Sequence, residues 1–222
     1  MAQIDKNTVE SKNQLGCSKH ITYENTDGMG TRVLFVGNSI TRHAPKADIG
    51  WNNDWGMAAS EKEKDYVHLV KKAVLEKDSD ATFCICQVAE WERNYKEGES
   101  QLLPFSEARD FNADIIIMRI IENCDTKVFD AEAFEKEYLN FIKFLNKKGT
   151  AKTIITSSFW AHPGDRVLEK IASENGCEFI YLGDLGEKDE MKAIGLFEHS
   201  GVAAHPGNLG MEMIAKRITE KI

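Results

Sequence analysis

Three polar side chains in this sequence are of the types that acyl-transfer chemistry uses. Ser39 lies in the stretch GNSIT, Asn123 in ENCD and His205 in HPGNLGM. A serine hydroxyl attacks a carbonyl carbon when a neighbouring base takes its proton, and histidine titrates close enough to neutral pH to be that base. An asparagine amide can donate a hydrogen bond to the developing oxyanion, which stabilises the transition state by roughly 3–4 kcal/mol. These residue types predict a nucleophile, a base and an oxyanion donor.

Each of these residues also has a simpler structural explanation. Ser39 could cap a helix, Asn123 could form a turn with its own backbone, and a lone loop histidine is often only a surface residue. The hypothesis of a shared site therefore depends on whether the fold brings the three residues together.

Five short apolar runs alternate with amphipathic segments along the chain. They are rich in β-branched residues and have the length of buried parallel strands. The runs cover residues 32–36, 81–88, 114–120, 152–156 and 178–182. We therefore expect an α/β fold: a three-layer α/β/α sandwich around a five-stranded parallel sheet with the flavodoxin-like strand order 2-1-3-4-5.

In a sheet of this order the ligand crevice lies at the carboxyl ends of the first and third strands, directly after Val36 and Ile120. Ser39 and Asn123 follow these two points in the sequence. His205 comes just before the last of four predicted helices, and a loop histidine in that place can reach across to a nucleophile. These helices are expected over residues 65–77, 130–149, 167–174 and 208–222.

Length and composition bound the class of protein. The 222 residues, 42% hydrophobic and 29% charged, fit one soluble domain. We expect a polar N-terminal lead over residues 1–30 and a single domain over residues 31–222. The net charge of −8 argues against nucleic acid or an anionic membrane as the main partner. No apolar run approaches the roughly 20 residues that a membrane span needs.

The sequence carries neither a secretory signal nor a metal-binding spacing. Its start has no apolar stretch behind basic residues, so the cytoplasm is the default location, with a processed secreted form left open. The five cysteines show no C-x-x-C spacing and are expected to be buried free thiols. We expect no metal and no cofactor, and the sequence does not determine the oligomeric state.

The stretch FVGNSIT resembles the first sequence block of the SGNH, or GDSL-like, hydrolases. HPGNLGM resembles their last block, which usually reads D-x-x-H-P-x-x-x-G, and the resemblance extends over residues 32–222. It implies an α/β/α fold and hydrolysis of a small ester, such as an acetyl group on a carbohydrate, without a cofactor. It also implies that Ser39 is the nucleophile, His205 its base and Asn123 an oxyanion donor, with the backbone N–H groups of Ser39 and Ala89 beside it.

The sequence departs from the blocks of this family at several positions. Asn38 stands where Asp is common, and Ile121 and Cys124 replace the Gly and Asp of the G-x-N-D block. The second block lacks its glycine, so Ala89 is the expected backbone donor and Gly56 a weaker candidate.

The largest departure is Val202, three residues before His205, where the family has its triad Asp. Three alternatives follow: a backbone carbonyl orients His205 in a Ser-His dyad, Glu198 folds back to it, or the enzyme is slow or inactive. We favour the carbonyl, with Glu198 second.

Other interpretations stay open at this point. One is a thioesterase or lipase-like enzyme of the same family, and another is a binding module that recognises a glycan without cleaving it. A separation of roughly 2.6–3.2 Å between Ser39 Oγ and the His205 ring would favour catalysis over binding. His162 is a rival for the base. The long connection over residues 43–64 is expected to shape the substrate site.

The four tryptophans could stack on a sugar ring or pack beneath loops. They are Trp51, Trp55, Trp91 and Trp160.

Overall fold

The five apolar runs form the parallel strands of a central sheet. In the computed structural model, which describes residues 20–222, these strands are β2 (Arg32–Gly37), β3 (Thr82–Gln87), β4 (Ile115–Arg119), β5 (Lys152–Thr156) and β6 (Glu178–Ile180). They pair in parallel in the order β3-β2-β4-β5-β6. Counted along the chain as five strands, this is the predicted order 2-1-3-4-5. The predicted fold class is therefore confirmed, and the residues that follow β2 emerge at the middle of the carboxyl edge.

A sixth, antiparallel strand corrects the predicted five-stranded parallel sheet and the predicted N-terminal boundary. β1 (Ile21–Glu24) pairs antiparallel with β3 and forms the edge of the sheet, so the domain begins before residue 31. This strand is only four residues long, and only its first residue, Ile21, is fully buried. Its backbone pairing with β3 holds it in place, and the short segment has no apolar pattern from which a strand could be predicted. The rest of the expected lead, residues 1–19, lies outside the described residues.

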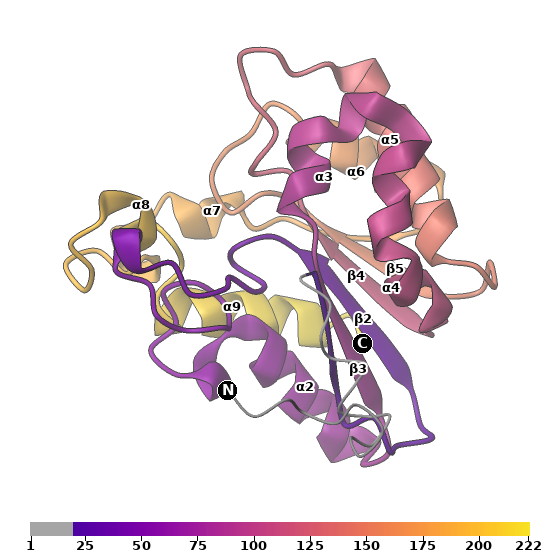
Figure 1. The fold of residues 1–222 in the computed structure, drawn as a ribbon, viewed down its shortest axis with the longest axis horizontal. Helices are drawn as coiled ribbons and strands as arrows, with labels where there is room; N and C mark the ends of the chain where they lie inside the picture. Colours follow the sequence, from indigo (N-terminus) through magenta and orange to yellow (C-terminus); the bar gives the residue numbers. More distant parts are fainter. Residues whose placement is uncertain (1–19) are drawn as a thin grey trace, which may run out of the picture.

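Two layers of helices cover the two faces of the sheet (Figure 1). One layer consists of α2 (Tyr66–Lys77) and α9 (Asn208–Thr219), and the other of α3 (Ala89–Asn94), α4 (Ser106–Asp110), α5 (Ala131–Leu145) and α6 (Asp165–Glu174). Side chains alternate between the faces along each strand. In β2, Val33 and Phe35 belong to the core under α2 and α9, whereas Leu34 and Val36 belong to the core under α3, α5 and α6.

Two of the four predicted helices, α2 and α5, begin at an aspartate that caps the first turn. Asp65 accepts a hydrogen bond from the backbone N–H of His68, and Asp130 accepts one from that of Ala133. These caps satisfy backbone donors that the first turn leaves unpaired. Within residues 20–222, no helix is long and apolar enough to cross a membrane.

A helical segment after β3 was not predicted. It consists of α3, η4 (Tyr95–Phe105) and α4, and it bends at Gly98, which has a φ of 76°. Trp91 of α3 is buried against Phe141 of α5, with ring centroids 4.9 Å apart. This tryptophan is a core residue and not a sugar-stacking platform.

The other elements are short and lie in the connections. They are η2 (Ala47–Ile49), η3 (Lys62–Lys64), α7 (Gly183–Gly186), η5 (Asp189–Met191) and α8 (Ser200–Ala203).

Candidate active site

Ser39 lies on a tight turn directly after the central strand β2. The backbone N–H groups of Thr41 and Arg42 both donate to the Asn38 carbonyl, which closes the turn. Gly37 is required before it, because a Cβ at this position would lie 1.7 Å from the Thr41 hydroxyl oxygen. The Thr41 hydroxyl is held in turn by Tyr66 at 2.7 Å. The turn thus presents Ser39 at the carboxyl edge of the sheet.

His205 contacts this serine across the crevice. Its Nε2 atom lies 2.7 Å from Ser39 Oγ, although the two residues are 166 positions apart in sequence. Its Nδ1 atom lies 2.7 Å from the carbonyl oxygen of Gly201 in α8. A carbonyl can only accept, so Nδ1 carries the proton and donates it there, which leaves Nε2 as the acceptor that faces the serine hydroxyl. This is the tautomer that a general base for Ser39 needs.

The surroundings of His205 favour its neutral form. Burial lowers its pKa to about 4, with the positive charges of Arg119 and His43 acting in the same direction and the hydrogen bond to Gly201 acting against them. Trp160 packs edge-on against the imidazole at a centroid distance of 5.0 Å, and its indole N–H donates to the Ala204 carbonyl. The ring is therefore fixed in place by packing as well as by hydrogen bonds.

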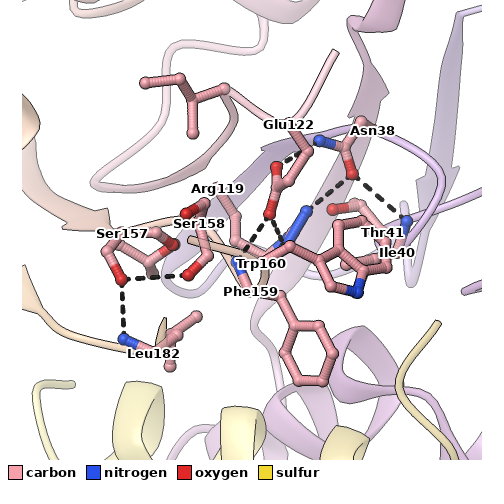
Figure 2. Close-up of polar contacts among 12 residues, drawn as sticks. Asn38, Ile40, Thr41, Arg119, Glu122, Ser157, Ser158, Phe159, Trp160 and Leu182 are labelled. Carbon is pink, nitrogen blue, oxygen red and sulfur yellow. Dashed lines mark hydrogen bonds and ion pairs between the residues drawn. The ribbon is translucent and has the colours of Figure 1, made fainter. Parts of the chain in front are cut away.

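Asn38 sits beneath the serine turn in a buried polar network. Its side-chain oxygen accepts from Arg119 Nη2 at 2.6 Å, and its Nδ2 donates to Glu122 at 2.6 Å. Arg119 Nη1 also donates to Glu122, and the backbone N–H of Phe159 donates to the same carboxylate (Figure 2). Asn38 and Arg119 have no exposed side-chain surface.

A second carboxylate, Glu92 of α3, joins this network to Asn123. It accepts hydrogen bonds from Asn38 Nδ2 at 3.0 Å, from the backbone N–H of Ile121 at 2.5 Å and from Asn123 Nδ2 at 2.7 Å. Burial and then the negative charge of Glu122 raise the pKa of Glu92 to about 7, while the three hydrogen bonds lower it. Glu92 thus ties together the segments that follow β2 and β4.

Several solved structures superpose on this chain. A lipase/acylhydrolase from Enterococcus faecalis superposes with a TM-score of 0.60 at 13% identity, over 87% of this chain and 95% of that one. An acetyl xylan esterase gives 0.54 at 19% identity, over 86% and 99% of the two chains. A protein described as a GDSL-like lipase, from Parabacteroides merdae, gives 0.56 at 16% identity, over 86% and 94%. The chain has the fold of the GDSL-like hydrolases. No protein-family model and no curated protein matches its sequence.

Within the GDSL-like fold, the carbonyl of Gly201 occupies the place beside Nδ1 that a triad acid would take. Val202 cannot supply an acid, and it is buried in a small apolar cluster with Trp51 and Met57. Glu198, the second candidate, is exposed, and the bond that orients Nδ1 goes to Gly201. The geometry therefore corresponds to the favoured alternative of a dyad with carbonyl support.

The expected oxyanion donors differ in whether their N–H groups are already used in hydrogen bonds within the protein. Within residues 20–222, the backbone N–H of Ser39 has no hydrogen-bond partner. That of Ala89 has only a long contact of 3.4 Å to the Gln87 side chain, and its φ is not positive, so an alanine is tolerated there. Gly56 N–H donates to Asp65 instead and is not available. Asn123 uses one amide hydrogen on Glu92, while its oxygen accepts from Arg93 at 3.0 Å.

Two other positions clarify the departures from the family blocks. Ile121, where the family has glycine, is fully buried with a φ of 146°, a region that a β-branched residue rarely adopts. The hydrogen bond from its N–H to Glu92 helps to hold that strained backbone. His162, the rival base, is buried elsewhere, with Nε2 3.2 Å from the Cys124 carbonyl and Nδ1 accepting from Gly164.

The connection over residues 43–64 forms one rim of the site. It folds back on itself through bridges between His43 and Trp55 and between Lys46 and Trp51. The N–H of Met57 donates to the Ser39 carbonyl at 2.8 Å, so this segment is attached directly to the serine turn. Trp51 is fully buried and supports the loop from inside.

Sequence reasoning missed the charged residues of the network. Arg119, Glu122 and Glu92 were not singled out, although an arginine inside the apolar run IIIMRI was a usable signal, because a buried cation needs anionic partners. Within residues 20–222, no group of three or more His, Cys, Asp or Glu side chains is arranged to hold a metal ion.

Proposed function

We propose that this chain is a serine esterase that removes a small acyl group, such as an acetyl group, from a carbohydrate or related alcohol. The observation that carries the proposal is the contact of 2.7 Å between Ser39 Oγ and His205 Nε2. Because Nδ1 donates to the Gly201 carbonyl, Nε2 is free to accept the serine proton. This distance lies inside the range of roughly 2.6–3.2 Å that a nucleophile and its base require.

The reaction proceeds through an acyl-enzyme. His205 Nε2 takes the Ser39 proton while Oγ bonds to the ester carbonyl carbon, and the oxyanion is held by the N–H groups of Ser39 and Ala89 and by the second amide hydrogen of Asn123. The bond to the alcohol then breaks, and the imidazolium gives its proton to the leaving oxygen. Water, deprotonated by Nε2, attacks the acyl carbon, and Ser39 leaves with the proton restored to Oγ.

The small acyl group is inferred from the kinds of protein that share this fold. The similar solved structures include an acetyl xylan esterase and an esterase active on acetylated mannans, so acetylated carbohydrate is the substrate class we infer.

The test compares p-nitrophenyl esters of two, four and eight carbons with wild type and Ser39→Ala side by side. We expect wild type to hydrolyse the acetyl ester fastest and Ser39→Ala to lose at least about a thousandfold in kcat. Equal turnover by the two proteins would rule out Ser39 as nucleophile. A maximum at eight carbons would favour the lipase-like alternative. Inactivity of both proteins on acetylated sugars as well would favour the glycan-binding alternative.

A further inference from the structure

A cavity of about 200 Å³ adjoins the serine turn on the side of α3. Its lining includes Arg42, which lies three residues after Ser39, and Ala89, whose backbone N–H is one of the proposed oxyanion donors. A substrate whose carbonyl reaches Ser39 therefore places its neighbouring groups against this cavity. Within residues 20–222, the lining consists of His20, Arg42, His43, Ala44, Gln87, Ala89, Glu90 and Arg93.

The charge of this cavity is opposite to that of the chain. The whole sequence has a net charge of −8. Within residues 20–222, the charged groups of its lining are nevertheless two guanidinium groups, Arg42 and Arg93, and one carboxylate, Glu90. Glu90 lies on the rim, with 57% of its side chain exposed, 3.7 Å from His20. A local concentration of cationic groups in an acidic protein favours an anionic ligand at that place.

The hydrogen bonds of Arg42 also favour an anionic ligand in this cavity. Its Nε and Nη2 atoms bind both oxygens of Asp54, at 2.9 Å and 3.0 Å. Its Nη1 atom is buried and has no hydrogen-bond partner within residues 20–222. A buried guanidinium donor without an acceptor is unfavourable, and an oxygen of a ligand in the cavity would satisfy it.

Arg93 provides a second, more exposed guanidinium. It donates from Nη2 to the Asn123 side-chain oxygen at 3.0 Å, and its other N–H groups have no acceptor among residues 20–222. Because Asn123 is a proposed oxyanion donor, a ligand held by Arg93 lies close to the reacting carbonyl.

We propose that this cavity binds an oxyanionic group, a carboxylate or phosphate, carried by the ester substrate next to its acylated hydroxyl. The inference rests on the proposed esterase function and names its substrate class, an acylated acidic sugar or similar anionic alcohol. Arg42 Nη1 and the free N–H groups of Arg93 are the donors, in the paired geometry that guanidinium offers to such anions.

The kinetic test uses three aryl acetates that differ in charge: 4-acetoxybenzoate, 4-acetoxyphenyl phosphate and the neutral 4-acetoxybenzamide. Each kcat/KM is divided by the hydroxide-catalysed rate of the same ester, which removes differences in intrinsic reactivity. We expect at least one anionic ester to be preferred about tenfold over the amide, equivalent to about 1.4 kcal/mol. The better of the two anions identifies the bound group, and the preference should fall as NaCl is raised.

Arg93→Gln should remove most of that preference, and Arg93→Lys should retain part of it. The matched control is Lys170→Gln on α6. Lys170 pairs with Glu135 and does not line the cavity, so this variant also removes one positive charge but should leave the preference unchanged. A wild-type ratio near one, or an equal loss on charged and neutral esters in Arg93→Gln, would overturn the proposal.

A binding measurement separates this proposal from the esterase proposal. Calorimetry with Ser39→Ala protein should detect 4-hydroxybenzoate or 4-hydroxyphenyl phosphate and not 4-hydroxybenzamide, and Arg93→Gln added to it should weaken that binding. Binding of an anion by a protein that hydrolyses no ester would contradict only the esterase function. Hydrolysis of the neutral ester without any anion binding would contradict only the cavity assignment.

Discussion

His205 is oriented by a neutral backbone carbonyl, and this has chemical consequences for the residue. The Gly201 oxygen fixes the tautomer as an acid would, but it carries no full charge to stabilise the imidazolium that forms during the reaction. Arg119 and His43 add positive potential, so the folded protein favours neutral imidazole. The proposed base is therefore unprotonated over a wide pH range, and its protonated form is less stabilised than in a triad.

The pH profile of ester hydrolysis should report this lowered pKa. With His205 titrating at about 4, we expect kcat/KM for the acetyl ester to stay level from pH 8 to pH 6 on account of this group and to fall to half near pH 4. Stability should change in the same direction. The unfolded chain binds more protons than the folded one between about pH 4 and pH 6.5, so acidification through this window destabilises the fold.

Initial rates at fixed ionic strength between pH 3.5 and 8 would check the profile. Glu92→Gln serves as a second background, because it removes the other group near the site that titrates within this range. A half-maximum that stays at pH 6.5 or above in both proteins would contradict the expected environment of His205.

Val202, which stands where a triad acid would be expected, has a structural role of its own. Its side chain is 1% exposed and packs in an apolar cluster with Trp51, Met57 and Ala193. Val202→Asp would place a carboxylate in that cluster while Nδ1 of His205 is already bonded to Gly201. We expect the variant to lose at least about 3 kcal/mol of unfolding free energy and to gain no activity.

Urea denaturation and kcat on the acetyl ester would measure both effects of Val202→Asp. Val202→Thr, with nearly the same shape and no charge, is the control and should lose clearly less stability. Higher kcat in Val202→Asp would mean that His205 does lack a charged partner and that α8 can rearrange to supply one.

At the level of elements, the hydrophobic pattern of the sequence predicted the buried strands and the amphipathic helices, because burial of apolar side chains determines both. The order of the five parallel strands and the helices α2, α5, α6 and α9 follow from apolar periodicity, and the structure confirms them. The position of Ser39 after β2 follows from the rule that ligands bind at the carboxyl ends of such strands.

Features that depend on tertiary pairing were not visible in the sequence. β1 has one fully buried side chain and is held by its backbone pairing to β3. The segment from α3 to α4 breaks its periodicity at Gly98. The network under the serine joins Glu92 of α3 to Arg119 of β4 and to Asn38, residues far apart in sequence whose proximity only the folded sheet creates.

This network couples α3 to the turns after β2 and β4, and Glu92 is its central acceptor. Glu92→Gln would place an amide N–H₂ among the donors from Asn38, Ile121 and Asn123, so at least one of these bonds is lost. We expect an unfolding free energy lower by about 1–3 kcal/mol at pH 8 and a lower kcat, because Asn123 is no longer held at the site.

The pH dependence of this difference has a definite sign. The pKa of Glu92 is raised to about 7 in the fold, so the folded state holds a proton that the unfolded state releases between about pH 4.5 and pH 7. Wild type therefore loses stability relative to Glu92→Gln as the pH rises through this window. Denaturation midpoints at pH 5, 6, 7 and 8 would measure it, with the exposed Glu99→Gln of η4 as control. A difference that does not change with pH would contradict the raised pKa.

At the scale of the whole molecule, the N-terminal strand is part of the domain. Besides its pairing with β3, it places Glu24 beside α2, where this carboxylate binds Lys62, His68 and Lys71. Burial raises the pKa of Glu24, but the hydrogen bonds from these three residues outweigh it and lower the pKa overall. Burial lowers the pKa of His68, but its hydrogen bonds to Asp65 and Glu24 outweigh burial and raise this pKa to about 9. The edge strand is thus fastened both to the sheet and to the helix layer.

Two substitutions in β1 should therefore behave in opposite ways. Ile21 is fully buried, and Ile21→Ala should lower the unfolding free energy by roughly 2–4 kcal/mol through lost contacts and a cavity. The neighbouring Thr22 has a buried hydroxyl with no hydrogen-bond partner among the residues that the structure describes, so Thr22→Val should leave stability unchanged or raise it slightly. Urea titrations followed by tryptophan fluorescence and by circular dichroism should give coincident transitions for both variants, because one cooperative unit unfolds. If Ile21→Ala changed stability by less than about 0.5 kcal/mol, as a surface substitution does, β1 would be only loosely attached and the domain would begin at β2.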